Sequence, residues 1–308
     1  MNLQRTLRSE VLISGVGVHT GLQIQLKIRP ALVNAGIVFM RTDLEGCPSI
    51  PATYKNIVCT RLATTLGVGQ ATVSTVEHIL AAFYGMGIDN AIVEVSGPEV
   101  PILDGSAAPF CKAIREAGIE IQYQQRRVLS LRRKVEIKIG EKWAVAEPSS
   151  GLEIFGSIDW DHPSIGYQEF HYKEGKTSFD DLASARTFGF LKEIEALKKM
   201  GLARGGSLDN AIVLDDALIL NPGGLRSPDE FVKHKVLDAL GDFKLAGFSI
   251  QAYIRLHRAG HDLHSQLLAE ILKNPNNYEI ISGREEAEKE ITSSLHALLA
   301  HGLVALHP

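Results

Sequence analysis

Two short segments of this chain resemble each other although about 120 residues separate them. Residues 87–95 read GIDNAIVEV and residues 207–215 read SLDNAIVLD. Each segment follows a helix-like stretch that ends at a glycine, and each precedes a turn rich in proline and glycine. A shared order of helix, turn, strand and turn predicts two copies of one supersecondary unit. The alternative is a chance match of the letters DNAIV.

Alternating apolar and polar residues predict strands in both halves of the chain, for example at residues 23–28, 135–139 and 152–155. Helix-like segments flank these strands without regular strand–helix alternation, which indicates an α+β fold with mixed or antiparallel sheets. The polar residues 122–127 are the predicted linker. We expect a first α+β domain at 1–124, a second at 128–270 and a C-terminal helical tail at 271–308.

The composition argues against several classes of protein. A formal net charge of −4 over 308 residues gives no reason to expect a nucleic-acid-binding surface. No run of about 18 apolar residues is present, so we expect no integral membrane segment, and the charged N-terminal stretch does not resemble a signal peptide. The three cysteines are scattered, which argues against a disulfide framework or a thiolate zinc site. We expect a cytoplasmic protein.

Residues 227–242 contain the strongest candidate for a functional helix. A serine and a proline at its start, with Glu230 placed to complete a capping box, predict a helix that begins at residue 227 or 228. His234, Asp238 and Asp242 follow at intervals of four residues and therefore share one face. An imidazole and a carboxylate one turn apart are suited to binding one metal ion.

A catalytic zinc usually has three protein ligands and one open position for water. His78 is the best third ligand among the eleven histidines, because a helix is predicted to start near Ser74 and Glu77 stands beside it. Glu77 is then placed to take a proton from water that the metal activates. The alternatives are a capping-box role for Glu77, a core or surface role for His78, and an ordinary polar pair for His234 and Asp238.

Two further segments contain candidate catalytic side chains. His261 follows Gly260 in a predicted loop after the strand at residues 248–254, a position suited to a general acid. Thr187 precedes a predicted helix, where its hydroxyl is either an N-cap or a donor to an oxyanion. Lys235 is either a functional cation or a surface lysine. The zincin motif, the Walker A loop and the nucleophile elbow of α/β-hydrolases are absent from the sequence.

Together these motifs resemble those of the UDP-3-O-acyl-N-acetylglucosamine deacetylases, the zinc amidohydrolases of lipid A biosynthesis. The resemblance extends from Arg5 to about Ala269, nearly the whole chain. Its motifs, in order, are STVEH at 74–78, DGSAAPF at 104–110, ARTFGF at 185–190, HKxxD at 234–238 and GH at 260–261. The resemblance implies two similar α+β domains, packed as a layered sandwich with the active site between them.

The resemblance also implies roles for single residues. The zinc ligands correspond to His78, His234 and Asp238, the base to Glu77 and the general acid to His261. Three more positions then have implied roles: Asp242 orients the general acid, Lys235 contacts substrate and Thr187 helps to hold the carbonyl oxygen.

An insert in the second domain is implied to form an apolar passage for the acyl chain. The passage corresponds to Phe188, Ile194, Gly206 and Val213. Plain core packing is the alternative for the two aliphatic members of this set. The tail beyond Ile271 matches no family motif and receives no role.

The expected cofactor is Zn²⁺, although Fe²⁺ accepts the same ligands. The expected partner is a small-molecule substrate, an acylated UDP-sugar, with no nucleic acid and with a monomer as the working expectation. One alternative is another metallohydrolase, such as a phosphoesterase, but two-metal sites need more clustered carboxylates than this chain offers. The other is a non-catalytic sugar-nucleotide-binding protein, which would tolerate the loss of Glu77 and His261.

Overall fold

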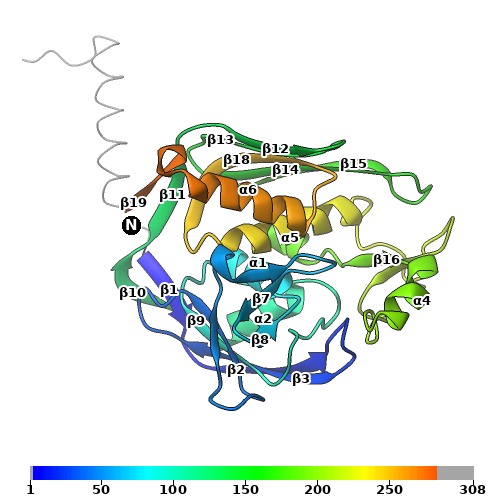
Figure 1. Ribbon diagram of the computed structural model, residues 1–308, viewed down its shortest axis with the longest axis horizontal. Helices are drawn as coiled ribbons and strands as arrows, with labels where there is room; N and C mark the ends of the chain where they lie inside the picture. Colours follow the sequence, from blue (N-terminus) through cyan, green and yellow to red (C-terminus); the bar gives the residue numbers. More distant parts are fainter. Residues whose placement is uncertain (1–2, 283–308) are drawn as a thin grey trace, which may run out of the picture.

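Helices lie between two β-sheets in the centre of the molecule (Figure 1). The computed structural model describes residues 3–282. One sheet is built from the first half of the chain and the other from the second half, and α1 (Glu77–Gly85) packs against α5 (Glu230–Lys244) between them. The expected α+β fold with two similar domains is therefore confirmed. Within the described residues, every helix is too short or too polar to span a lipid bilayer.

The first sheet has five strands in the order β2-β3-β9-β4-β5. The strands are β2 (Val11–Val16), β3 (Gln23–Pro30), β4 (Ile37–Arg41), β5 (Ser49–Pro51) and β9 (Ala91–Val95). β4 and β9 are parallel and the connection between them contains α1, whereas all other neighbours are antiparallel. Ile24, Leu26 and Ile28 on β3 are buried, because alternate side chains of a strand point to the same face.

The second sheet has seven strands and contains the same kind of crossover. The strands are β11 (Arg127–Leu131), β12 (Val135–Ile139), β13 (Lys142–Glu147), β14 (Leu152–Trp160), β15 (Gly166–Lys173), β18 (Ser249–His257) and β19 (Tyr278–Ser282). β14 and β18 are parallel, and the connection between them contains α5. β13 and β15 pair antiparallel with β18 and β14 respectively.

The two sheets share one topology, which supports a duplicated unit. The order β2-β3-β9-β4-β5 in the first sheet corresponds to β12-β13-β18-β14-β15 in the second. The strands that flank each unit also correspond: β1 (Leu3–Leu7) pairs antiparallel with β10 (Ile119–Gln125), and β11 pairs antiparallel with β19. The helices α1 and α5 are therefore counterparts.

The two similar sequence segments, however, do not lie on corresponding strands of the two sheets. Residues 87–95 contain β9, whose counterpart is β18, whereas residues 207–215 contain β17 (Ile212–Leu214). Within residues 3–282, β17 lies outside both main sheets and its partner strand is β16 (Phe188–Phe190). Both β9 and β17 follow a helix and pair in parallel with a strand that precedes that helix in the chain (β4 and β16 respectively), so the match reflects a similar local path of the chain.

The connection between the domains is extended chain instead of an irregular linker. β10 ends at Gln125 and β11 begins at Arg127, so the predicted linker at 122–127 is mostly strand. Residues 278–282, predicted to belong to a helical tail, form β19 beside β11. The predicted amphipathic segment at 291–303 lies outside the described residues. The domain boundaries themselves stay a prediction.

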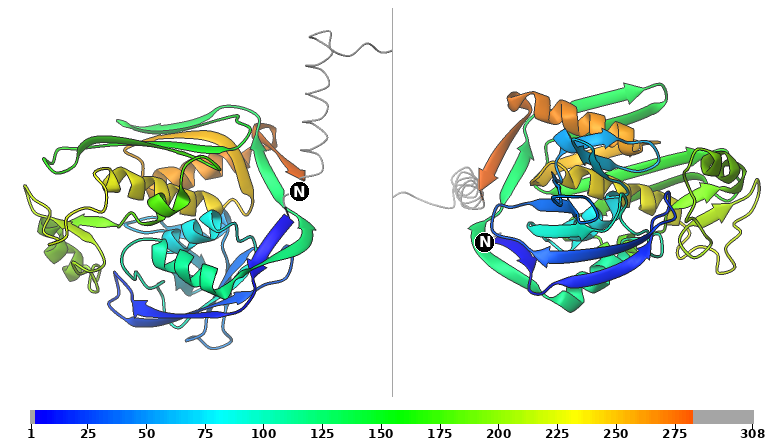
Figure 2. Two further views of the ribbon diagram at one scale, coloured as in Figure 1. Left: turned by 180° about the vertical axis from the view of Figure 1, so that it is seen from behind. Right: turned by 60° about the horizontal axis from the view of Figure 1, so that its bottom comes forward.

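Shorter elements complete the two domains. They are α2 (Ala108–Ala117), α3 (Phe179–Ala183), α4 (Leu191–Lys199), α6 (His261–Lys273), β6 (Ile57–Cys59), β7 (Thr65–Val68), β8 (Ala71–Val73) and the 3-10 turns η1 (Tyr54–Asn56) and η2 (Pro275–Asn277). β6, β7 and β8 form a small antiparallel sheet that leads into α1. The unit β16–α4–β17 lies at the edge of the molecule in both views of Figure 2.

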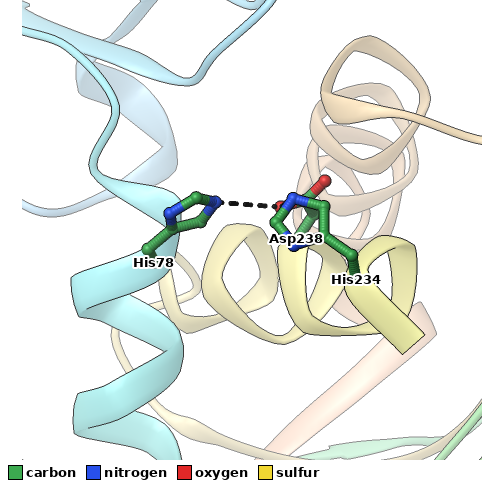
Figure 3. A group of neighbouring side chains, drawn as sticks. All are labelled: His78, His234 and Asp238. Atoms are coloured by element: carbon green, nitrogen blue, oxygen red, sulfur yellow. Dashed lines mark ion pairs between the residues drawn. The ribbon is translucent and has the colours of Figure 1, made fainter. Parts of the chain in front are cut away.

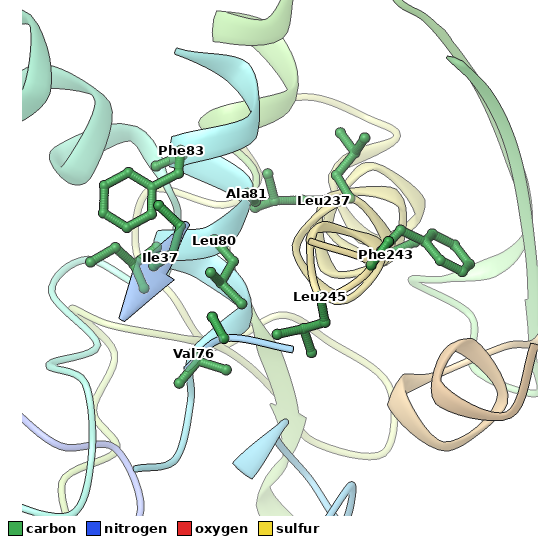
Figure 4. Packing of buried hydrophobic residues seen from close by; sticks show 14 of the residues in the cluster. Ile37, Val76, Leu80, Ala81, Phe83, Leu237, Phe243 and Leu245 are labelled. Atoms are coloured by element: carbon green, nitrogen blue, oxygen red, sulfur yellow. The ribbon is translucent and has the colours of Figure 1, made fainter. Parts of the chain in front are cut away.

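The crossing of α1 and α5 is the centre of the hydrophobic core. Leu80 on α1 and Leu237 and Phe243 on α5 are buried in one cluster that includes residues of both domains (Figure 4). Gly241 makes the crossing unusually close, because a Cβ atom there would lie 2.0 Å from the carbonyl oxygen of Glu77. The helices that carry the candidate site are thus held at a distance that only glycine permits at this position.

Candidate active site

Three buried side chains from the two crossing helices converge on one point. His78 projects from α1 toward His234 and Asp238 on α5 (Figure 3). The Oδ1 atom of Asp238 lies 3.6 Å from Nε2 of His78 and 3.2 Å from Nε2 of His234. One ligand atom from each residue lies within 4.8 Å of the others. The predicted metal ligands are therefore brought together.

The chemistry of these three side chains fits a divalent cation. Asp238 Oδ1 is buried and accepts no hydrogen bond, although both imidazole Nε2 atoms face it. The Nδ1 atom of His234 lies 3.1 Å from the carbonyl oxygen of Ala185, which fixes Nδ1 as the protonated nitrogen and leaves Nε2 with a free lone pair. A cation between the three atoms would supply the missing partner for the carboxylate oxygen.

Burial and charge hold these ligands in the forms that bind metal. Burial lowers the pKa of His234 to about 3, so its imidazole is neutral near pH 7. Burial alone would raise the pKa of Asp238, but the neighbouring His234 and Lys235 hold it well below its usual range. A neutral imidazole and an ionised carboxylate are the forms that donate lone pairs to a metal.

Glu77 lies beside the proposed metal ligands and is not a capping residue. The helix α1 begins at Glu77 itself, and its N-cap residue makes no side-chain capping bond. The Oε2 atom of Glu77 accepts a hydrogen bond from the backbone N–H of Thr64 at 3.0 Å, and Oε1 lies 3.9 Å from Nε2 of His261. Burial raises the pKa of the Glu77 carboxyl, while the charge of His261 opposes this rise. A carboxylate with a raised pKa suits a general base.

His261 and Asp242 form a buried pair on the other side of Glu77. Nδ1 of His261 donates to Oδ2 of Asp242 at 2.8 Å. Burial opposes protonation of this imidazole, but Asp242 and Glu77 raise the pKa of His261 to about 9. The predicted loop position is wrong, because His261 is the first residue of α6 and follows the N-cap Gly260. The helix start fixes the direction of the imidazole.

The start of α5 also differs from the prediction. The helix begins at Glu230 and has no side-chain cap, so the expected capping box with Ser227 does not form. The Glu230 carboxylate is instead buried and accepts hydrogen bonds from the Arg186 side chain and from the backbone N–H of Arg226. This ion pair ties the segment before β16 to the helix that carries His234.

Lys235 and Thr187 lie at the edge of the same site. The Lys235 ammonium group lies 2.7 Å from Oδ2 of Asp238 and 5.6 Å from the centre of the Phe188 ring. Thr187 precedes the strand β16 and not a helix, so the N-cap alternative is wrong. Its backbone N–H bonds to the Gly105 carbonyl of the first domain at 2.8 Å, which fixes its place between the domains.

The predicted passage residues lie on and around the unit β16–α4–β17. Phe188 is half-buried, and its ring centre lies 6.4 Å from that of His234. Val213 is buried on β17, Ile194 is half-buried on α4 and Gly206 is exposed. Their role in binding an acyl chain stays a prediction.

Three polar residues near the site were missed by sequence reasoning. Thr64 donates from its hydroxyl to Oδ1 of Asp242, and the buried His264 donates from Nδ1 to Oδ2 of the same carboxylate. His19 lies close enough to His261 for the positive charge of the latter to lower its pKa, in addition to the larger effect of burial. His264 lies one helical turn after His261, a spacing that would have revealed it if a helix had been predicted there.

Fold and site together indicate the class: a two-domain α+β metalloenzyme whose candidate metal ligands come from both halves of the chain. Residues 4–273 match the family model described as UDP-3-O-acyl N-acetylglycosamine deacetylase. A relative from Myxococcus xanthus (strain DK1622), named UDP-3-O-acyl-N-acetylglucosamine deacetylase, is 48% identical over 282 residues, which are 91% of this chain and 90% of that protein. One with the same name from Teredinibacter turnerae (strain ATCC 39867 / T7901) is 47% identical over 300 residues, 96% of this chain and 99% of the relative. The chain belongs to the family of UDP-3-O-acyl-N-acetylglucosamine deacetylases.

Proposed function

We propose that this protein removes the N-acetyl group from UDP-3-O-(3-hydroxyacyl)-N-acetylglucosamine and releases acetate, as an early committed step of lipid A biosynthesis. The observation that carries the proposal is the convergence of His78 with His234 and Asp238 beside Glu77 and His261. Amide hydrolysis needs an electrophilic centre, a base for water and an acid for the leaving nitrogen. The proposed substrate is inferred from the family to which the chain belongs.

We propose Zn²⁺ as the metal, held by His78, His234 and Asp238. Two imidazoles and one carboxylate are a ligand set typical of catalytic zinc, although Fe²⁺ accepts the same set. When bound, such an ion supplies Lewis acidity to the acetamide carbonyl and to a water molecule. The salt bridge from Lys235 to Asp238 leaves Oδ1 as the carboxylate oxygen that faces both histidines.

Glu77 and His261 then move the protons. The free Oε1 atom of Glu77 takes a proton from the attacking water, since Oε2 is already held by Thr64. Protonated His261 donates from Nε2 to the amine nitrogen as the C–N bond breaks. Asp242 holds Nδ1 of this imidazole and stabilises its charged form. Base and acid are therefore neighbours at the proposed metal site, with Oε1 of Glu77 3.9 Å from Nε2 of His261.

Thr187 and Lys235 are proposed to act on the substrate. In this proposal the Thr187 hydroxyl donates to the carbonyl oxygen as negative charge develops, an effect typically worth about 3 kcal/mol per donor. Lys235 is placed to contact substrate from the turn after His234. We propose that the acyl chain lies along Phe188 and past the β16–α4–β17 unit, in contact with Ile194, Gly206 and Val213.

We also propose a cytoplasmic enzyme that works as a monomer. Cys47, Cys59 and Cys111 are free thiols, which suits a reducing compartment.

Acetate release and metal content measured together test this function. Wild type is expected to hold one metal ion per chain and to release acetate from the acylated sugar nucleotide. Glu77→Ala and His261→Ala are expected to lower kcat by about 100-fold or more with little change in KM, since each removes a proton-transfer group. His171→Ala, at an exposed position on β15, is the matched control and should behave as wild type.

Two outcomes would contradict the proposal. Unchanged turnover in either Ala variant would favour a non-catalytic sugar-nucleotide-binding protein. Phosphate release without acetate release would favour a different metallohydrolase.

A further inference from the structure

Thr64 contacts both proton-transfer groups of the proposed mechanism from one buried position. It is 1% exposed and lies in the loop before β7, outside the helices that carry the site. Its backbone N–H donates to Oε2 of Glu77 at 3.0 Å, and its hydroxyl donates to Oδ1 of Asp242 at 2.5 Å. Its carbonyl oxygen also accepts from the backbone N–H of Val76, directly before α1.

These bonds determine which carboxylate oxygens remain available. Because Thr64 occupies Oε2 of Glu77, Oε1 is the oxygen that faces His261 at 3.9 Å. Because Thr64 occupies Oδ1 of Asp242, Oδ2 is left to accept from His261 and His264, each at 2.8 Å. A carboxylate that is held through both oxygens in a buried site cannot rotate freely.

We infer that Thr64 is a positioning residue that orients the general base through its backbone N–H and the general acid through Asp242. The inference rests on the proposed function of Glu77 and His261. Thr64 is not itself proposed to bind metal or substrate, so it acts through the two carboxylates that it contacts. Removal of a supporting hydrogen-bond partner of this kind typically costs about 10- to 100-fold in activity.

The neighbouring Thr65 provides a matched control. Its hydroxyl also makes one side-chain hydrogen bond, to the Ser74 hydroxyl at 2.9 Å, but this bond contacts neither carboxylate. Thr64→Val and Thr65→Val remove the same atom from adjacent residues and conserve the shape of the side chain. Thr64→Ser restores the hydroxyl and tests whether the bond, not the methyl group, matters.

The first measurement is the kinetics of acetate release by the metal-loaded full-length variants. Thr64→Val is expected to lower kcat by about 10- to 100-fold with KM within about 2-fold of wild type. Thr64→Ser and Thr65→Val are expected to keep most of the wild-type kcat. Metal content and thermal midpoint, measured on each variant, should match wild type within error.

The second measurement is a double-mutant cycle with Asp242→Ala. If the hydroxyl acts through Asp242, Thr64→Val should cost less than about 2-fold in the Asp242→Ala background. Full additivity in this cycle, or wild-type kcat in Thr64→Val, would overturn the inference. A lower kcat in Thr64→Val would also overturn the inference if Thr64→Ser shows the same low kcat. Absence of acetate release by wild type would instead refute the proposed function, so the two failures are distinguishable.

Discussion

At the scale of single residues, one carboxylate holds two histidines in place. Asp242 Oδ2 accepts from Nδ1 of both His261 and His264 at the same distance of 2.8 Å. Burial alone would raise the pKa of Asp242, but these two histidines lower it to about 2. The carboxylate therefore stays ionised and stabilises a proton on His261.

The pH dependence of kcat/KM is expected to be bell-shaped for this reason. Activity rises as Glu77 loses its proton, at a pH above the usual range of a glutamate because burial raises its pKa. Activity falls as His261 loses its proton, with a pKa of about 9 in the free protein. Asp242→Asn removes the charge that raises this pKa, so the basic limb should move to lower pH. An unmoved basic limb in Asp242→Asn, measured across pH 5 to 10 at about half-unit steps, would contradict the assignment of His261 as the acid.

The predicted and the missed residues differ in the kind of signal they leave in the sequence. His234 and Asp238 could be selected as candidate metal ligands because their i, i+4 spacing places both on one face of a helix. His78 lies about 160 residues from these two and was selected only because Glu77 stands beside it at a predicted helix start. Thr64 was not predictable: a hydroxyl that bonds across the fold has no local pattern, and its contacts depend on how the helices cross.

At the scale of elements, the close crossing of α1 and α5 sets the geometry of the site. Gly241 lies in the interior of α5, where glycine usually costs about 0.5–1 kcal/mol relative to alanine. Glycine is nevertheless required here, because the backbone of Glu77 occupies the space that a side chain at position 241 would need. Glycine at this position thus permits the close packing of α1 against α5, at the expense of the intrinsic helix propensity of α5.

Gly241→Ala is expected to lower the free energy of unfolding, whereas a glycine-to-alanine change in a helix interior usually raises it. The added methyl group must separate α1 from α5, and overpacking of this kind typically costs about 1–3 kcal/mol. Because His78 lies on one helix and Asp238 on the other, metal affinity should fall as well. Denaturant unfolding and metal titration measure both effects, with Gly151→Ala as a control whose Cβ would meet nothing within 4 Å. A stabilised Gly241→Ala variant would refute the packing argument.

The elements show where sequence patterns were sufficient and where they were not. The strand at 135–139 was predicted with its observed bounds, since its alternation reflects one buried face. The start of α5 was placed too early, because the Arg186–Glu230 ion pair replaced the expected cap. His261 was placed in a loop because a histidine after glycine resembles a turn, whereas α6 begins there.

At the scale of the whole molecule, the proposed metal site connects the two domains. His78 comes from the first half of the chain, and His234 and Asp238 come from the second half. A ligand that binds only the folded protein raises its free energy of unfolding, by about 2.7 kcal/mol at a free concentration 100 times Kd. The metal should therefore act as a stabilising cross-link as well as a catalyst.

Removal of the metal with a chelator is expected to lower the thermal midpoint, and added Zn²⁺ should restore it. His78→Ala should lose most of this difference, because the remaining pair lies on one helix and no longer joins the domains. His171→Ala should keep it in full. Calorimetry measures the thermal midpoint of each sample. If the chelator leaves the midpoint of wild type unchanged, a metal at this site is excluded.

The duplicated topology has a consequence for how the chain matures. The first copy of the unit contributes a single imidazole, and the second contributes an imidazole and a carboxylate, so neither copy alone forms a complete chelate. A nascent chain in which only the N-terminal half has folded is therefore expected to bind a metal ion weakly. If the proposed ion binds here, its tight retention therefore requires a chain that is synthesised in full and has both halves docked.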